Sequence, residues 1–288
     1  MHCIDAKTIL SAKNGMNIYR GCTHGCIYCD SRSDCYQMDH PFEDIAVKQN
    51  APELLEDALR RKRKPCMIGT GSMCDPYMHC EEGLGYTRRC LEIIDKYNCG
   101  VTVITKSDRI LRDIDLFEQI NRHSKAVVQM TLTTYDEKLC RIIEPNVCST
   151  KRRYEVLKEF QKRGIPTVVW LCPILPYIND TEDNLRGILD YCFGAGVVGI
   201  INFGFGVTLR NGNREYFYQK LDEHFPGMKE RYQKRFGNSY ECPSDNATKL
   251  WGIFKRECQT RGVMYSPNDI FSYLNDYPTA NEQLSLFD

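Results

Sequence analysis

Short apolar runs rich in Val, Ile and Thr alternate with longer amphipathic segments over the first two thirds of the chain. Nearly continuous apolar runs of this length are typical of parallel strands that are buried on both faces. The pattern predicts strands at residues 16–19, 66–69, 101–105, 126–132, 167–172 and 197–203. Between them, apolar residues recur with a helical period, which predicts helices at residues 52–63, 84–97, 108–121, 150–163 and 181–193.

This alternation predicts an α/β fold built from right-handed βαβ units. Six strands before about residue 205 favour a partial (β/α)6 barrel of the TIM type with additional C-terminal helices, and a doubly wound open sheet is the alternative. In both architectures the functional face lies at the carboxyl ends of the strands. The residues that follow the expected strands are short, polar or glycine, and they are 70–77, 106–107, 133–134, 173–177 and 204–206.

The chain divides into three expected regions. Residues 1–210 would form the barrel with its N-terminal loop. Residues 211–265 would form a helical extension of the same domain, with two or three polar helices. Residues 266–288 would form a C-terminal tail.

The composition indicates the class of protein but not any reaction that it catalyses. Lys plus Arg equals Asp plus Glu at 38 each, so net charge indicates neither an acidic nor a basic partner. No apolar run approaches the roughly 18 residues of a membrane span, and the N-terminus does not resemble a secretory signal. We therefore expect a cytoplasmic protein whose sixteen cysteines are mostly reduced, and a disulfide framework is unnecessary for a chain with a core of this size.

Three cysteines lie close together in the run R-G-C-T-H-G-C-I-Y-C-D at residues 20–30. They are Cys22, Cys26 and Cys29, and Gly21 and Gly25 permit the positive φ angles of a tight loop. Such a loop directs three sulfurs to one point but offers no obvious fourth ligand, whereas ordinary electron-transfer clusters use four cysteines. The spacing therefore favours a [4Fe–4S] cluster with one open iron.

A structural zinc site is the alternative metal centre. Cys35 lies close enough in sequence to complete a four-cysteine set, and His24 can substitute as a ligand. Structural zinc sites usually pair two separate C-x2-C units, and this loop contains only one such pair.

The C-x3-C-x2-C spacing, with Tyr28 directly before the last cysteine, resembles the signature of the radical SAM enzymes. Further segments make the chain similar to the spore photoproduct lyase branch of that superfamily: Gly69-Thr-Gly-Ser-Met-Cys-Asp-Pro-Tyr77, Val103-Ile-Thr-Lys-Ser107, and Ile143-Glu-Pro-Asn146 followed by the basic Lys151-Arg-Arg153. The resemblance implies a partial TIM barrel, a [4Fe–4S] cluster on the three cysteines, and reductive cleavage of S-adenosylmethionine to a 5′-deoxyadenosyl radical.

The same resemblance implies contacts to S-adenosylmethionine. Lys106 would pair with the methionyl carboxylate, and Tyr28 would line the adenine side. Thr131 and Thr133, expected on one side of a strand, would hydrogen-bond the amino acid moiety or the ribose. Further candidates for cofactor binding follow the second strand, and these are Gly69, Thr70 and Ser72.

The resemblance also implies a hydrogen-atom donor near the end of the second strand. Cys74 is the candidate in this chain, although Ser72 is the alternative match to the lyase cysteine, and Tyr77 is a second catalytic candidate on the same loop. A lyase-like DNA repair enzyme would also need an electron donor such as flavodoxin or ferredoxin.

The last residues carry a different motif. The run Gln283-Leu-Ser-Leu-Phe287 resembles the short peptide by which bacterial polymerases and repair proteins bind the sliding clamp, with Leu286 and Phe287 as apolar anchors. We therefore expect an enzyme that acts on damaged or modified nucleic acid. The alternatives are a radical SAM enzyme for a peptide or small metabolite, and a non-catalytic, zinc-stabilised clamp-binding adaptor.

Overall fold

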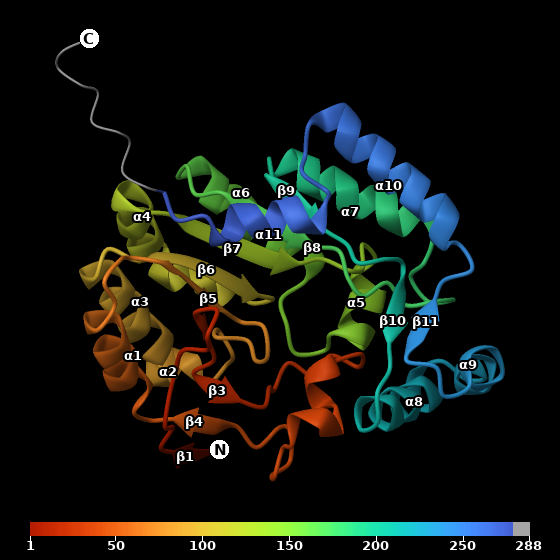
Figure 1. Cartoon of the computed structure of the whole chain (residues 1–288). Coiled ribbons are helices and arrows are strands. Elements are labelled where there is room, and N and C mark those ends of the chain that lie inside the picture. The colour runs from red at the N-terminus through yellow and green to blue at the C-terminus, as the bar shows by residue number, and fades with distance from the viewer. Residues whose placement is uncertain (279–288) are drawn as a thin grey trace.

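A six-stranded parallel sheet lies at the centre of the computed structural model, which describes residues 1–278 (Figure 1). Its strands, in spatial order, are β2 (Gly15–Met16), β5 (Met67–Thr70), β6 (Gly100–Thr105), β7 (Ala126–Thr131), β8 (Thr167–Trp170) and β9 (Gly199–Ile201). Each strand pairs with the next strand of the sheet along the chain. A doubly wound sheet would reverse direction at a switch point, so the predicted partial (β/α)6 barrel is confirmed.

Helices cover the outer side of this sheet. They are α1 (Ala51–Arg60), α3 (Tyr86–Lys96), α4 (Ile114–His123), α6 (Thr150–Lys162) and α7 (Glu182–Gly194). Alternate strand residues such as Val128, Val169 and Ile200 belong to the core that these helices form. The side chains of Ser149 and Thr181 cap α6 and α7 by accepting backbone N–H groups, so these helices begin close to their predicted starts.

The inner side of the sheet is covered by α11 (Pro267–Asn275), which crosses in front of β7 and β8 in Figure 1. One buried apolar cluster joins Ile270 and Leu274 of this helix with Val127, Val168 and Ile201 of the sheet. The expectation of a tail from residue 266 onwards is therefore wrong for this segment, which is part of the barrel core. Residues 283–287, the expected clamp-binding peptide, lie outside the described residues.

The chain also contains elements that the sequence pattern did not predict. A small sheet joins β1 (His2–Ile4), β4 (Ala46–Lys48) and β3 (Tyr19–Arg20), and a second one pairs β10 (Gly206–Thr208) with β11 (Glu241–Pro243). The expected strand at 16–19 is consequently divided between β2 and β3, which belong to different sheets. The other elements, some of which lie in predicted helical regions, are η1 (Asp30–Arg32), η2 (Asp34–Tyr36), α2 (Glu81–Leu84), η3 (Asp108–Asp113), α5 (Glu137–Ile143), α8 (Asn213–His224), α9 (Met228–Phe236) and α10 (Ala247–Arg261).

Two predicted helices differ at their starts. The helix expected at 84–97 is interrupted at Gly85, whose φ of 66° ends α2 before α3 begins. The helix expected at 108–121 opens with the 3-10 turns of η3 before the α-helical α4. The three helices α8, α9 and α10 agree with the polar helices predicted for the C-terminal extension.

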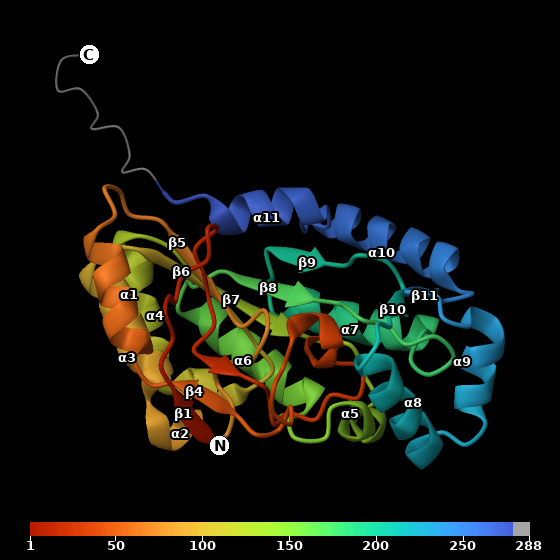
Figure 2. The same ribbon diagram turned by 60° about the horizontal axis from the view of Figure 1, so that its bottom comes forward.

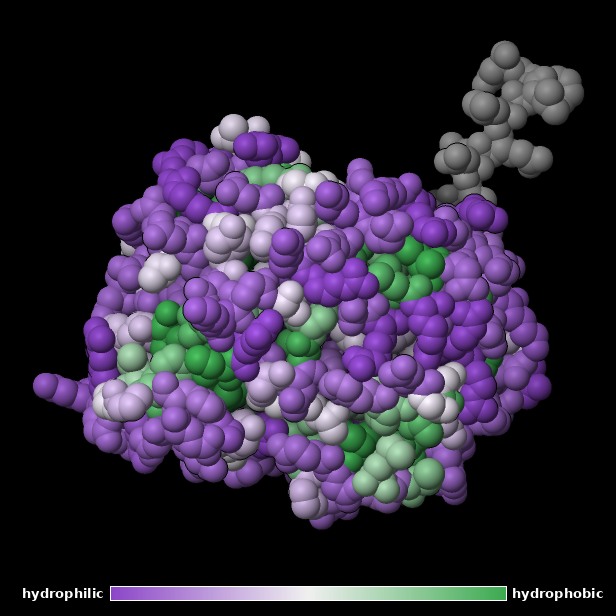
Figure 3. Space-filling view, turned by 180° about the vertical axis from the view of Figure 1, so that it is seen from behind, coloured by the Kyte–Doolittle hydropathy of each residue, from purple (hydrophilic) through white to green (hydrophobic). Residues whose placement is uncertain are grey.

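The N-terminal segment that carries the cysteine run lies over the carboxyl ends of the strands, where Figure 2 shows it in red and orange beside α8 and β10. Figure 3 shows the opposite face, on which hydrophilic side chains surround separate hydrophobic patches. Within residues 1–278, no helix is both long and apolar enough to cross a membrane.

Candidate active site

The cysteine run forms a tight loop between β3 and η1. Gly21 and Gly25 have φ angles of 86° and 70°, in the left-handed region that glycine adopts readily. A Cβ atom at Gly21 would lie 2.4 Å from the carbonyl oxygen of Phe42, and one at Gly25 would lie 3.1 Å from Pro145. Gly21 is therefore required by close packing as well as by its backbone conformation, and Gly25 is favoured by its backbone conformation.

The three cysteines of this loop border one cavity of about 760 Å³ at the carboxyl ends of the strands. All three thiols are free. Burial raises the pKa of Cys22, and it raises the pKa of Cys26 to about 12, so these groups are neutral thiols in the absence of metal. Metal ligation requires thiolates, and loading this site should therefore release protons.

The three sulfurs are not arranged as the ligands of a single zinc ion. A tetrahedral zinc site with Zn–S bonds of about 2.3 Å places its sulfurs roughly 3.8 Å apart. Within residues 1–278, the three cysteines do not form a group whose ligand atoms all lie within 4.8 Å of one another. Cys35 does not border the cavity, and its sulfur instead accepts a hydrogen bond from Arg210 at 3.3 Å. The spread of the sulfurs suits a larger, multi-iron group.

The segment after α5 holds the cysteine loop in place. The carbonyl of Ile143 accepts a hydrogen bond from the backbone N–H of Ile27 at 3.0 Å. Asn146 donates to the loop twice, from its backbone to the carbonyl of His24 at 3.1 Å and from its side chain to that of Thr23 at 2.9 Å. The Ile-Glu-Pro-Asn motif therefore positions the loop that carries the three cysteines.

A buried ion pair completes this support. Arg153 donates to Glu144 at 2.6 Å, and both side chains are fully buried. Tyr28 donates its hydroxyl hydrogen to the same carboxylate, and Arg153 also donates to the carbonyl of Thr131 at 2.6 Å. Burial opposes ionisation of Glu144, but Arg153 and Lys106 outweigh it and lower the pKa of the carboxyl group. Arg153 therefore belongs to the site rather than to an exposed basic surface.

Asp75 connects the loop after β5 with β6 and with the cysteine loop. Its carboxylate accepts hydrogen bonds from the hydroxyl of Thr105 at 2.7 Å, the backbone N–H of Lys106 at 2.7 Å and the backbone N–H of Tyr77 at 2.8 Å. Nδ1 of His24 lies 3.4 Å from the same carboxylate. The Asp-Pro turn of the sequence thus links the ends of β5 and β6 to the cysteine loop.

His24 is buried behind the cavity. It is 2 % exposed, and burial lowers its pKa, so its ring is neutral. Its Nε2 atom is buried and has no hydrogen-bond partner among the described residues. Buried polar atoms are normally paired. His24 also borders the cavity, so a group bound beside its ring could supply the missing partner.

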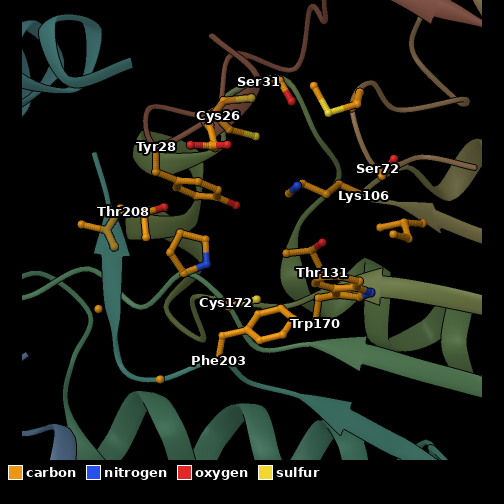
Figure 4. Close-up of a pocket in the computed structure, with 18 of the residues that line it drawn as sticks. Cys26, Tyr28, Ser31, Ser72, Lys106, Thr131, Trp170, Cys172, Phe203 and Thr208 are labelled. Atoms are coloured by element: carbon orange, nitrogen blue, oxygen red, sulfur yellow. The ribbon is translucent and has the colours of Figure 1, made fainter. Parts of the chain in front are cut away.

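Lys106 extends into the cavity, and Figure 4 shows its amine directed toward the ring of Tyr28. The amine lies 5.9 Å from the centroid of that ring and has no carboxylate partner within salt-bridge distance in the described part of the chain. Burial would lower the pKa of Lys106, but nearby acidic groups, which include the carboxylates of Glu144 and Asp75, raise it, so the group is a cation at neutral pH. An unpaired cation of this kind is suited to bind an anionic ligand.

Other predicted residues divide between the cavity and the core. Ser72, Cys74 and Thr131 border the cavity. Gly69 and Thr70 do not, because they lie inside β5 and pair with β2 and β6.

Tyr77 and Thr133 also lie away from the cavity. Tyr77 is 0 % exposed, and its hydroxyl donates to Asp113 at 3.1 Å, so its expected catalytic position is wrong. The side chain of Thr133 is fully buried, and its carbonyl accepts from Asn179 and Asn184, each at 2.9 Å. Because β7 ends at Thr131, the strand alternation that was expected to place both threonines in the site does not extend to Thr133.

Several residues around the cavity were not predicted individually. Among them are Trp170, Cys172, Phe203, Thr208 and Tyr240. The expectation that the site lies at the carboxyl ends of the strands identified the correct edge of the sheet. However, β8 and β9 end two residues earlier than predicted, so Trp170 and Phe203 were assigned to strands and not to the loops that follow them. Strands β10 and β11, which form one wall of the cavity, were not predicted. Each has only three residues, which is too short to show a periodic pattern of apolar residues in the sequence.

A sequence profile described as the Radical SAM superfamily matches residues 16–191. The chain belongs to this superfamily. An uncharacterized protein of Methanocaldococcus jannaschii is 33% identical over 181 residues, which cover 62% of this chain and 67% of that protein. An uncharacterized protein of Mycobacterium tuberculosis is 26% identical over 229 residues, covering 77% of this chain and 66% of that protein. The matched regions thus span about two thirds of these relatives.

More distant similarity extends to a phage protein and to solved structures. The radical SAM Nalpha-GlyT isomerase of Pseudomonas phage M6 is 22% identical over 220 residues, covering 75% of this chain and 41% of that protein. A variant of spore photoproduct lyase superposes with a TM-score of 0.66 at 14% identity, covering 92% of this chain and 80% of that one. Another lyase structure, with bound AdoMet and dinucleoside spore photoproduct, has a TM-score of 0.63 at 12% identity, covering 88% and 75%. The radical SAM chain therefore has the fold of spore photoproduct lyase, and the superfamily's cofactors are a [4Fe–4S] cluster and S-adenosylmethionine.

Proposed function

We propose that this radical SAM enzyme acts on a damaged or modified base in nucleic acid, by chemistry similar to that of spore photoproduct lyase. The observation that carries the proposal is the shared cavity: the three cysteines, the unpaired cation of Lys106 and the thiol of Cys74 all border it. The enzyme would thus hold cofactor and substrate in one space that protein surrounds on several sides.

In this proposal each residue has a defined task. Cys22, Cys26 and Cys29 would hold three irons of the cluster and leave the fourth for S-adenosylmethionine. The bound cluster would supply the electron that cleaves S-adenosylmethionine to methionine and a 5′-deoxyadenosyl radical. Lys106 would bind the methionyl carboxylate, and Tyr28, fixed by Glu144, would border the nucleoside.

Cys74 is suited to provide a hydrogen atom. It is 5 % exposed, and its sulfur donates to the carbonyl of Tyr19 at 3.0 Å. Burial raises its pKa to about 12, so the group remains a thiol, the form that carries an S–H hydrogen, at neutral pH. Ser72, which also borders the cavity, is the alternative position for such a donor in the same loop.

The ligand of one similar structure supports a nucleic-acid substrate. Spore photoproduct lyase has been solved with a dinucleoside photoproduct, and the phage protein is named as a radical SAM Nalpha-GlyT isomerase. A one-electron donor such as flavodoxin or ferredoxin would complete the reaction in the cell.

An assay for 5′-deoxyadenosine tests this function. The protein is reconstituted with iron and sulfide under anaerobic conditions, reduced with dithionite and incubated with S-adenosylmethionine. We expect 5′-deoxyadenosine to form faster when a thymine-rich single-stranded oligonucleotide is present after ultraviolet irradiation than with the same oligonucleotide before irradiation. Equal rates with both oligonucleotides, together with stimulation by a peptide or small metabolite, would reject the nucleic-acid substrate and retain the radical SAM chemistry.

Replacing Lys106 with alanine should weaken S-adenosylmethionine binding by about 1.5–3 kcal/mol, the range for hydrogen bonds to charged groups. The expected cause is the loss of the only charge partner assigned to the methionyl carboxylate. Equilibrium binding to the reconstituted protein measures the change, and iron content should remain that of the wild type. Lys138→Ala, which removes an exposed lysine from α5, is the matched control and should have no effect. Unchanged affinity in Lys106→Ala would show that the amine does not contact the cofactor.

We further propose that the run at 283–287 binds the bacterial sliding clamp. Replacing Leu286 and Phe287 together with alanine should abolish clamp binding, since each apolar anchor can contribute more than about 1 kcal/mol in a partner's pocket. Surface plasmon resonance with immobilised clamp measures this loss. The same variant should retain wild-type iron content and cofactor cleavage, because neither substituted residue is among those assigned to the cluster or to S-adenosylmethionine. Undiminished clamp binding by the double variant would remove the motif from the proposal.

A further inference from the structure

Aromatic side chains border the end of the cavity that lies opposite the cysteine loop. Figure 4 shows Trp170 and Phe203 on the far side of the cavity from Cys26, with Lys106 and Thr131 between them. The contacts assigned above to the cluster and to the methionyl group leave these two rings without a function. We define the aromatic platform as Trp170, Phe203 and Phe271, whose ring centroids lie 5.9 to 6.1 Å apart.

Phe203 is unusually exposed for its type. It is 62 % exposed, although it borders a cavity and has apolar neighbours. One side of its ring is stacked on Phe271 of α11, with an interplanar angle of 19°. Exposed aromatic surface at a cavity is a common property of ligand-binding sites, because the ligand supplies the missing apolar contact.

The turn after β9 keeps Phe203 out of the core. The side chain of Asn202 accepts a hydrogen bond from the backbone N–H of Gly204 at 2.6 Å and donates to the carbonyl of Leu171 at 3.1 Å. Gly204 has a φ of 125°, a conformation that favours glycine. Phe203 lies between these two fixed residues, so its exposure results from a defined turn rather than from a loose loop.

The indole of Trp170 is equally well fixed. Its N–H donates to the side-chain oxygen of Gln129 at 2.7 Å, and the amide of Gln129 donates to the hydroxyl of Thr102 at 2.5 Å. Gln129 and Thr102 are 3 % and 7 % exposed, and the three residues lie on the neighbouring strands β8, β7 and β6. A ring held by a buried chain of this kind is oriented before any ligand binds, which reduces the entropy lost on binding.

We propose that the aromatic platform binds one base of the nucleic-acid substrate by stacking. This inference rests on the proposed function, because it assigns the substrate class to a particular surface of the same cavity. The three side chains of the platform are uncharged aromatic rings, and a planar base can stack on the exposed ring of Phe203. Stacking on aromatic side chains is the usual way in which single-stranded bases are bound without dependence on their sequence.

The adenine of S-adenosylmethionine is the competing occupant, and the experiment separates the two. Binding of a fluorescein-labelled hexathymidylate to the anaerobically reconstituted protein is followed by fluorescence anisotropy, and S-adenosylmethionine binding is measured on the same preparation. Phe203→Ala should weaken hexathymidylate binding about tenfold or more, as expected for the loss of one stacked base. Phe203→Tyr should retain wild-type affinity, and the affinity of Phe203→Ala for S-adenosylmethionine should be unchanged.

Trp251→Ala is the matched control, because it removes a partly exposed aromatic side chain from α10, and its affinity for hexathymidylate should equal that of the wild type. If wild-type protein binds hexathymidylate and Phe203→Ala binds it equally well, the platform proposal is wrong and the proposed function stands. If Phe203→Ala loses S-adenosylmethionine affinity instead, the platform binds the cofactor's adenine. If wild-type protein binds hexathymidylate neither before nor after ultraviolet irradiation, both the platform and the nucleic-acid substrate are rejected.

Discussion

Anaerobically purified protein should bind about four irons per chain, and alanine at Cys22, Cys26 or Cys29 should abolish that binding. The expected cause is that the loop supplies all three protein ligands of one cluster, so that the loss of any one leaves two. Iron and sulfide analysis, with the visible absorption of the brown protein, measures the result. Because the loop is fixed by its neighbours rather than by the cluster, the variants should still fold.

Cys35→Ala is the control for this prediction, since its thiol contacts Arg210 away from the cavity. It should bind iron as the wild type does. Stoichiometric zinc without iron, lost in Cys35→Ala, would contradict the cluster and restore the zinc-site alternative. The ligand atoms of His2, His40 and Asp44 lie within 4.8 Å of one another, so any zinc found should also be measured in His40→Ala before it is assigned to the cysteines.

The parts of the fold that were predicted are those whose signals are local. Strands β5, β6, β7 and β8 were found because long apolar runs can be read from the sequence without knowledge of their partners. By contrast, β10 and β11 have three residues each, and their pairing joins segments more than thirty residues apart. Helix α11 was missed, although the sequence contains local signals for it. Ser266 and Pro267 are a typical cap and first-turn proline, and Ile270 and Leu274 have helical spacing.

In the site, too, features formed by neighbouring residues in the sequence were predicted, and contacts between distant residues were not. The cysteine loop could be recognised because its three cysteines lie within eight consecutive residues. The support for that loop was not, since Tyr28 and Glu144 are 116 positions apart in sequence. A basic run at the start of a helix is usually a solvated surface, and only the fold shows that Arg153 turns inward while its neighbour Arg152 remains exposed.

The contrast between these two adjacent arginines predicts a large difference in the stability of their variants. Arg153→Met should lower the free energy of unfolding by about 3–5 kcal/mol, because it leaves the buried carboxylate of Glu144 without its main charge partner. Arg152→Met is the matched control. Its ion pair with Asp108, at 2.9 Å, involves a side chain that is 44% exposed, and its loss should cost no more than about 1 kcal/mol. Urea unfolding of the two variants, followed by circular dichroism, measures both changes.

The pH dependence of this effect identifies its cause. In the wild type the pKa of Glu144 is lowered, so its contribution to stability is present above the carboxyl's ordinary pKa and is lost as pH falls through the lowered value. In Arg153→Met, burial should instead raise the pKa of Glu144, and the penalty for its charge should disappear as the carboxyl is protonated. The stability difference between the two proteins should therefore narrow below about pH 5.

A second substitution separates charge from packing. Replacing both partners, as in Glu144→Leu with Arg153→Met, should restore much of the stability, since exchange of a whole buried ion pair for apolar side chains is often neutral. The double variant should nevertheless lose iron-binding capacity, because Tyr28 and the carbonyl of Thr131 would no longer be fixed by the pair. If Arg152→Met and Arg153→Met were equally destabilised and the double variant bound iron normally, the ion pair would have no role in supporting the cysteine loop.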